Sequence, residues 1–198
     1  MPKAKTGKKS PADIVIITGL SGSGMSSATN AFEDLGYFCV DNLPLTLLPT
    51  FARLVHAQED ERGRIDRAAL VISFREGQFL SDFAKQLRVL RKGGLGVSVI
   101  FFEAADEILA RRFSETRRPH PADRGKGLFD AIGAEREAMK PIRALADEIV
   151  DTSDHTVHSL RKGLLDRFSA RGDAVPLRVQ VLSFGHKFGP PRDRKSVV

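Results

Sequence analysis

A run of β-branched residues, Ile14–Ile17, leads into a loop rich in glycine and serine, and the loop opens a helical stretch. The loop reads Gly19-Leu-Ser-Gly-Ser-Gly-Met-Ser26 and fits the pattern G-x-x-x-x-G-K-[ST] at every fixed position except the lysine. Glycines let backbone N–H groups approach an anion closely, and the N-terminus of the following helix points at the same anion. A flexible linker is the alternative, but the flanking strand and helix favour a phosphate-binding loop.

Met25 stands where this pattern has its lysine. A thioether offers phosphate neither a charge nor a hydrogen-bond donor. A charged hydrogen bond contributes roughly 1.5–3 kcal/mol, so we expect nucleotide affinity to be lower by about one to two orders of magnitude. Catalysis should suffer more than binding, because charge that develops on the transferred phosphoryl group loses its stabiliser. A single base separates codons for lysine and methionine, so a sequencing error is the alternative.

Strand and helix signals alternate along the chain, which predicts βαβ units, and the ligand site of such a sheet lies at the carboxyl ends of its strands. The expected fold class is therefore α/β, a P-loop NTPase/kinase-like three-layer fold with a mainly parallel sheet. Phe38, Cys39, Phe101 and Phe102 are expected in the core rather than in contact with a cofactor. Strands are predicted at 14–17, 37–40, 69–74, 97–102, 148–150 and 178–182. Helices are predicted at 26–35, 47–55, 79–90, 106–119 and 131–146, the last of these interrupted at Pro141. A final helix is capped by Ser153 or Asp154 and runs to Phe168.

The length of 198 residues suits one domain and the beginning of a second. The net charge of +6 lies in the two ends of the chain, which leaves the residues between them balanced. We expect these basic ends to be solvated, with nucleic-acid contact as the alternative. No apolar run is long enough to span a membrane, no secretory signal precedes Asp13, and the single cysteine, Cys39, fits a cytoplasmic protein.

Three further groups of residues are candidates for a site, and the histidines are not. Asp41 ends the second predicted strand and is a candidate catalytic base or Mg²⁺ partner, or else caps the following turn. Thr152 and Ser153 flank a base or, as we favour, cap a helix. His120 and the other histidines lack metal-ligand spacing, so no zinc is expected. The candidates for a lid over phosphates, with a solvated helix face as the alternative, are Arg111, Arg112, Arg117 and Arg118.

The block Phe32-Glu-Asp-Leu-Gly-Tyr-Phe-Cys-Val-Asp-Asn-Leu-Pro44, with the loop before it, resembles the RapZ family of nucleotide-binding RNase adapter proteins. The stretches 111–118, 149–153 and 183–189 agree in the same order. The resemblance implies a P-loop domain that binds ATP or GTP and hydrolyses it slowly at most. It also implies a separate C-terminal domain that, in part of the family, binds small regulatory RNA and presents it to a ribonuclease.

The same resemblance assigns two nucleotide segments. The family's second segment, of the form D-[VIL]-R-[NGE], has Ser73 in place of its aspartate here, and serine is a weaker partner for Mg²⁺. Arg75 remains to meet phosphate or base, or is a surface arginine. The Ser26 hydroxyl is the predicted, weak Mg²⁺ ligand. The ATP-binding residues are Gly19, Leu20, Ser21, Gly22, Ser23, Gly24, Met25 and Ser26, and the GTP-binding residues are Ser73, Phe74, Arg75 and Glu76.

We expect a disordered basic tail over 1–12, a nucleotide-binding domain over 13–172 and a truncated start of the RNA-binding domain over 173–198. The last six residues, Asp193–Val198, leave the family pattern, and a common sequencing-adapter string encodes them. Contacts with small RNA and a ribonuclease, and oligomer formation, are therefore expected only of a full-length form. The alternative function is a small P-loop kinase or NTPase enzyme, against which Met25 and Ser73 argue.

Overall fold

The computed structural model describes residues 13–57, 65, 67–73, 79–92, 96–115, 120–123, 125 and 127–169. Within them, five strands form one parallel sheet in the order β2-β3-β1-β4-β5. The basic tails and the strand predicted at 178–182 lie outside the described residues. The strands are β1 Asp13–Gly19, β2 Phe38–Val40, β3 Arg67–Val71, β4 Gly96–Glu103 and β5 Glu148–Asp151.

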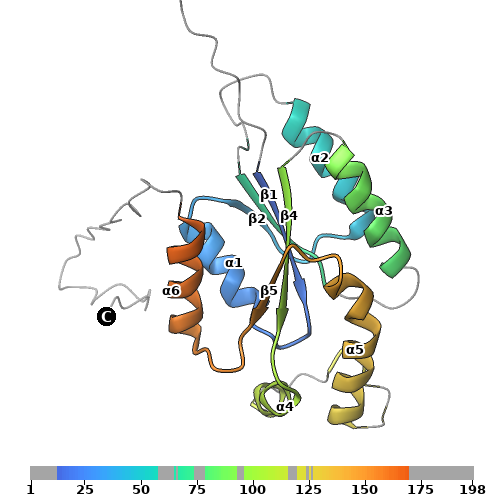
Figure 1. Ribbon diagram of the computed structural model, residues 1–198, viewed down its shortest axis with the longest axis vertical. Coiled ribbons are helices and arrows are strands. Elements are labelled where there is room, and N and C mark those ends of the chain that lie inside the picture. Colours follow the sequence, from blue (N-terminus) through green and yellow to red (C-terminus); the bar gives the residue numbers. More distant parts are fainter. Residues whose placement is uncertain are drawn as a thin grey trace, which may run out of the picture.

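Helices cover both faces of the sheet, so the predicted three-layer α/β fold is confirmed. Figure 1 shows α1 and α6 on one face and α2, α3 and α5 on the other, with α4 near the carboxyl ends of the strands. No helix among the described residues is both long and apolar enough to cross a membrane. The helices are α1 Met25–Asp34, η1 Leu45–Leu47 (a short 3₁₀ turn), α2 Leu48–Ala57, α3 Phe79–Lys92, α4 Asp106–Ser114, α5 Leu128–Arg143 and α6 Val157–Phe168.

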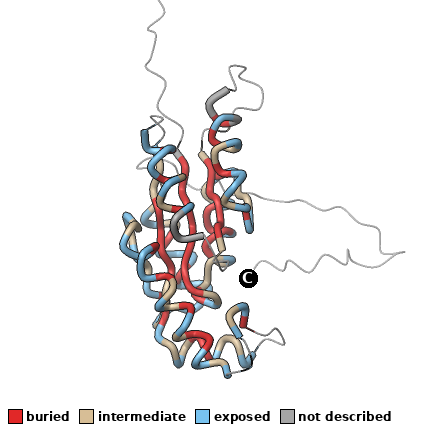
Figure 2. The backbone as a smooth tube through the Cα atoms, turned by 90° about the vertical axis from the view of Figure 1, so that its right-hand side faces the viewer, coloured by how far each residue is buried: buried red, intermediate tan, exposed pale blue. Residues whose placement is uncertain are grey.

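The central strands are buried on both faces. Ile14 and Ile16 of β1 pack against the layer of α2, α3 and α5, whereas Val15 and Ile17 pack against α1 and α6. Continuous apolar runs of this kind are typical of parallel strands covered on both sides, and Figure 2 shows these strands as buried segments between the helices. Phe101 and Phe102 of β4, predicted as core, are at most 1% exposed.

The core prediction for Phe38 fails because β2 lies at the edge of the sheet. Phe38 is 51% exposed, and its ring stacks on that of Phe51 with centroids 6.3 Å apart. Cys39 is half-buried against the cluster beneath α1 and α6. Periodicity alone did not distinguish an edge strand from a central one.

Three further local predictions differ from the structure. Pro141 does not interrupt α5, because it stands in the last turn of the helix. The N–H that proline lacks, and the clash of its ring with the carbonyl one turn earlier, therefore disturb only the end of the helix. The cap of α6 is Thr156, whose hydroxyl accepts from the Ser159 N–H at 3.1 Å, rather than Ser153 or Asp154. β3 ends at Val71, short of Ser73.

Candidate functional site

The loop after β1 turns tightly at the carboxyl end of the sheet. A methyl group on Gly19 would lie 2.1 Å from the carbonyl oxygen of Phe102 on β4, and the Leu20 N–H donates to that same oxygen at 3.0 Å. Gly24 adopts a left-handed conformation with φ of 98° and precedes α1 without a side-chain cap. A residue with a Cβ is strained at both glycines, so the loop needs them to bring strand and helix together.

The loop keeps several polar groups available for a ligand. Among the described residues, the N–H groups of Gly22, Gly24, Met25 and Ser26 donate to no protein acceptor. The Ser23 hydroxyl is buried and has no hydrogen-bond partner among those residues. Unengaged donors at the N-terminus of a helix form an anion site, so the geometry fits a polyphosphate.

Met25 is the first residue of α1, and its half-buried side chain packs against the cluster beneath α1 and α6. Ser26 follows it and is exposed. The loop therefore presents main-chain donors and one accessible hydroxyl, while the position that usually carries a lysine contributes to apolar packing.

A buried carboxylate holds the first turn of the loop. Glu135 of α5 is 2% exposed and accepts from the Ser21 N–H at 3.0 Å and from the Ser21 hydroxyl at 2.7 Å. His120, whose side chain is fully buried, has its Nε2 3.3 Å from Glu135 Oε2, although the two atoms lack hydrogen-bond geometry.

A second set of contacts ties the loop to β5 and α4. The Thr152 hydroxyl donates to the Ser23 carbonyl at 2.8 Å. Arg112 of α4 donates to the Gly22 carbonyl and to the Thr152 hydroxyl, both at 3.0 Å. Burial and then the nearby charge of Arg111 lower the pKa of Arg112. Because its charge is partly removed from water, the guanidinium would be stabilised by an anion nearby.

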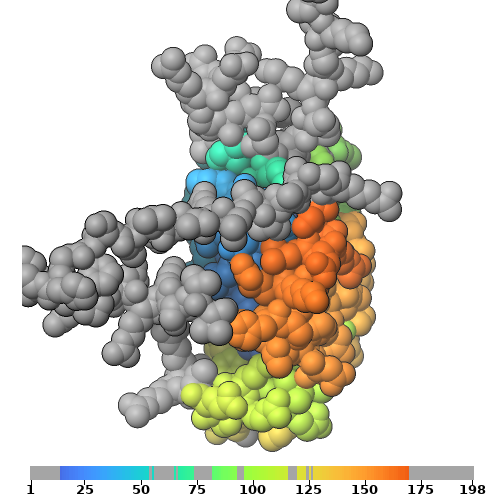
Figure 3. Space-filling model, turned by 90° about the vertical axis from the view of Figure 1, so that its left-hand side faces the viewer, coloured from blue at the N-terminus to red at the C-terminus, as the bar shows by residue number. Residues whose placement is uncertain are grey.

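A hollow of about 490 Å³ lies between this network and the start of α6. Figure 3 shows α4 and α6 next to each other on this side of the molecule. The volume suits a small ligand such as a nucleoside. The hollow is lined by Gly22, Gly24, Ser27, Arg111, Arg112, Glu115, Thr152, His155, Thr156, Val157 and Leu160.

The structure gives less support to the other residues that the sequence predicted for the site. Asp41 is exposed after β2, and no hydrogen bond or ion pair of the described residues reaches its side chain. Ser73 is half-buried beyond the end of β3, and Arg111 is exposed on α4. The candidates outside the described residues are Phe74, Arg75, Glu76, Arg117 and Arg118.

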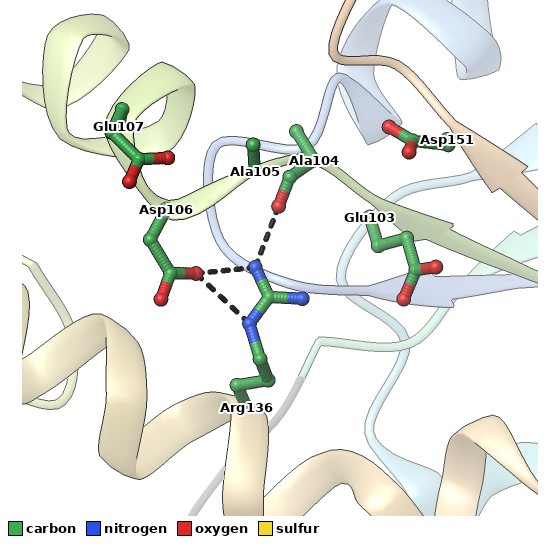
Figure 4. A pocket seen from close by; sticks show the side chains of 7 residues that line it. All are labelled: Glu103, Ala104, Ala105, Asp106, Glu107, Arg136 and Asp151. Carbon is green, nitrogen blue, oxygen red and sulfur yellow. Dashed lines mark hydrogen bonds and ion pairs between the residues drawn. The ribbon is translucent and has the colours of Figure 1, made fainter.

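A second hollow, beside β4 and α5, carries several carboxylates, of which Figure 4 shows Glu103, Asp106 and Asp151 around Arg136. Arg136 donates to Asp106 at 2.9 Å and to the Ala104 carbonyl at 2.6 Å. Hydrogen bonds from the Ser153 hydroxyl and N–H lower the pKa of Asp151. No group of three or more His, Cys, Asp or Glu in the described part of the chain could hold a metal ion.

Sequence reasoning missed Glu135, and it assigned Thr152 mainly to a helix cap. A signal for Glu135 was present, since it lies on the same helical face as Ile132, Met139 and Ile142, all of them buried. A charged residue in a core stripe needs a partner. The partner here is a loop residue more than a hundred positions away, which periodicity does not identify.

Comparisons with solved structures agree with this fold. Shikimate kinase from Bacteroides thetaiotaomicron is similar with a TM-score of 0.54 and 15% identity, over 80% of this chain and 99% of that chain. Shikimate kinase from Acinetobacter baumannii in complex with shikimate gives a TM-score of 0.52 and 14% identity, over 82% and 96%. Likeness at this identity shows the P-loop kinase-like fold alone.

Curated relatives are much closer in sequence. A nucleotide-binding protein of Acidobacterium capsulatum is 48% identical over 181 residues, which are 91% of this chain and 57% of that protein. One of Koribacter versatilis is 48% identical over 196 residues, 98% of this chain and 62% of that protein. The chain thus spans about three-fifths of the length of these relatives. Residues 12–172 match the model of the RapZ-like N-terminal domain, and the chain belongs to that family.

Proposed function

We propose that this chain binds ATP or GTP through the main chain of its phosphate loop. The observation that carries the proposal is the set of N–H groups at Gly22, Gly24, Met25 and Ser26, which have no acceptor among the described residues. These donors and the dipole of α1 together favour a polyphosphate. The relatives named above are themselves nucleotide-binding proteins.

In this proposal the base occupies the hollow between Arg112 and the start of α6. Arg112 and the exposed Arg111 supply positive charge near the loop, which partly compensates for the lysine that Met25 replaces. Mg²⁺ accompanies the nucleotide and is held by phosphate oxygens and the accessible Ser26 hydroxyl, since Mg²⁺ commonly takes few protein ligands beside phosphates.

We propose that turnover is slow at most. The loop has no ammonium to stabilise charge on the transferred phosphoryl group, and Ser73 stands where the family's aspartate would hold Mg²⁺ or its water. Asp41 is the candidate base, but no partner among the described residues orients its side chain. A regulatory role that responds to bound nucleotide fits this arrangement better than a kinase.

The relatives are longer than this chain, which covers 57% and 62% of their lengths. We propose that residues 13–172 form the nucleotide-binding unit and that residues 173–198 begin a second domain, through which a full-length cytoplasmic form contacts small RNA and a ribonuclease. Nucleotide binding would then modulate that RNA-directed activity.

Isothermal titration with ATP and with GTP, each with and without Mg²⁺, tests the proposal, beside a measurement of phosphate release. The matched variant is Met25→Lys, which we expect to bind about ten- to a hundredfold more tightly, because a charged hydrogen bond is restored. Absence of binding at millimolar nucleotide in the unmodified chain would overturn the proposal. Phosphate release at about 1 s⁻¹ or faster, within the range of kinases, would favour the enzyme instead.

A further inference from the structure

The contact between Glu135 and the phosphate loop is made by a buried carboxylate. Glu135 and His120 are almost completely removed from water, and a buried carboxylate is strongly destabilising unless hydrogen bonds compensate it. Both carboxylate oxygens of Glu135 accept from one residue, Ser21, by its N–H and its hydroxyl. A bidentate contact of this kind fixes the orientation of the Ser21 peptide as well as its position.

Ser21 directly precedes the part of the loop whose amides are available. The next residue, Gly22, has a left-handed backbone with φ of 80°, and its N–H belongs to the set without an acceptor. Because consecutive peptide planes share one Cα, fixing the Ser21 peptide restricts the direction of the Gly22 N–H and of the donors after it. Glu135 contacts the loop at the point where this direction is set.

The same carboxylate is connected to the segment that follows α4. His120 Nδ1 accepts from the Ala122 N–H at 3.1 Å, and the Nε2 of the same ring lies 3.3 Å from Glu135 Oε2. The rings of His120 and Phe113 pack with centroids 4.6 Å apart. Phe113 in turn lies against the loop, since a methyl group on Gly22 would come within 3.0 Å of its ring.

The neighbouring residue on α5 holds the other end of α4. Arg136 donates to Asp106, the first residue of α4, and to the carbonyl of Ala104 just before it (Figure 4). Two successive residues of α5 therefore contact the phosphate loop and the helix that carries Arg111 and Arg112. α5 is the element through which the loop and α4 are held in one geometry.

We propose that Glu135 is a positioning residue of the phosphate loop, which it holds ready for phosphate, and that through α5 and His120 it couples loop occupancy to the docking of α4. The inference rests on the proposed nucleotide binding. It assigns Glu135 no contact with the nucleotide and no chemical step.

Two substitutions separate the geometry of this contact from its charge. Glu135→Gln keeps an oxygen to accept from the Ser21 N–H and an amide to donate to the Ser21 hydroxyl, so the contact survives without the charge. Glu135→Leu removes both hydrogen bonds at similar volume. The affinities for inorganic tripolyphosphate, ATP and adenosine are measured by calorimetry. The rate of hydrogen exchange is measured for a peptide that contains α4. Both measurements are made with each variant in the unmodified chain and in the Met25→Lys chain.

Glu135→Gln should bind tripolyphosphate and ATP within about threefold of the parent, whereas Glu135→Leu should bind both at least about tenfold more weakly, because two hydrogen bonds are lost. Adenosine affinity should change in neither variant. Tripolyphosphate should slow exchange of the α4 peptide in the parent and in Glu135→Gln but not in Glu135→Leu. A role confined to stability would lower Tm and leave the ratio of ATP to adenosine affinity unchanged.

The inference is overturned if folded Glu135→Leu binds tripolyphosphate like the parent, or if Glu135→Gln is as weak as Glu135→Leu. If Glu135→Leu does not fold, Ser21→Ala takes its place as the test, because it removes only the hydrogen bond from the Ser21 hydroxyl. We expect Ser21→Ala to bind tripolyphosphate about threefold more weakly. An unchanged affinity of Ser21→Ala for tripolyphosphate would overturn the inference. If only proteins that carry Met25→Lys bind nucleotide, the proposed function of the unmodified chain is wrong. The inference about Glu135 is then tested by comparing the Glu135 variants in the Met25→Lys protein.

Discussion

The loops at the carboxyl ends of the strands differ between the two sides of the sheet; we call those after β1, β4 and β5 the first rim and those after β2 and β3 the second rim. On the rim formed by β1, β4 and β5, Glu135, Thr152 and Arg112 tie the phosphate loop to α5, β5 and α4. On the rim formed by β2 and β3, Asp41 is exposed and its side chain has no partner among the described residues. Ser73, on the same rim, stands where the predicted second nucleotide segment would have its aspartate.

The difference indicates which requirements this site meets. Holding a polyphosphate needs a rigid set of main-chain donors, and the first rim supplies the contacts that make the loop rigid. Phosphoryl transfer needs in addition an oriented base and a firmly held metal, for which the second rim would have to contribute groups at Asp41 and at position 73. The first rim suits the proposed binding, whereas on the second rim Asp41 has no partner among the described residues that would orient it, and position 73 carries no carboxylate for the metal. Three experiments test this contrast, and a fourth tests the burial of Cys39 on β2.

The largest effect is expected from Gly19→Ala on the first rim. A methyl group there would meet the Phe102 carbonyl oxygen at 2.1 Å, and this backbone atom cannot move aside. We expect a loss of about 3 kcal/mol or more in the free energy of unfolding, measured in urea. Gly36→Ala is the control, because Gly36 also has a positive φ but no atom within 4 Å, and should cost about 1–2 kcal/mol. Equal losses would show that the close approach is unimportant.

A smaller effect is expected when the hydroxyl of Thr152 is removed. Thr152→Val keeps the shape of the side chain but leaves the Ser23 carbonyl and one donor of Arg112 without this partner. The free energy of unfolding should fall by about 2 kcal/mol. Ser73→Ala on the opposite rim should change it by less than about 0.5 kcal/mol. A comparable loss at both positions would remove the contrast between the rims.

An aspartate at position 73 should restore part of the second rim. Ser73→Asp adds a carboxylate for Mg²⁺ or its water, so ATP should bind about tenfold more tightly when Mg²⁺ is present, about 1.4 kcal/mol. Ser73→Asn, of similar size but uncharged, is the control and should show no such dependence on Mg²⁺. Titrations with and without the ion make the comparison. Identical results for the two variants would mean that position 73 does not face the metal.

The smallest effect concerns Cys39 on β2. Burial, and then the charge of Glu33, raise the pKa of this thiol from 9.0 to about 11. The folded state therefore favours the neutral thiol, so its contribution to stability is complete below pH 9 and is lost as pH rises from 9 to 11. Urea unfolding at about pH 8 and about pH 10 measures the loss. Cys39→Ala should lack this component, and an equal decline in both proteins would assign it to other groups.

The sequence was most informative where structure depends on neighbours along the chain. The loop after β1, the alternation of strands with helices and the burial of Phe101 and Phe102 all follow from local patterns. The exposure of Phe38 did not follow, because the order of strands in the sheet decides which strand lies at an edge. The role of Thr152 was missed because its partner, Ser23, is distant in sequence.

By itself, the sequence determined that this chain has a glycine-bearing phosphate loop between a strand and a helix, with Met25 in place of a lysine. Conformational freedom at glycine and the chemistry of a thioether are properties of the residues, and they need no knowledge of the fold. Only the tertiary structure decided which groups hold that loop, because Glu135, Thr152 and Arg112 reach it from α5, the end of β5 and α4. Polar contacts between such distant segments exist only after the sheet and its helices have packed.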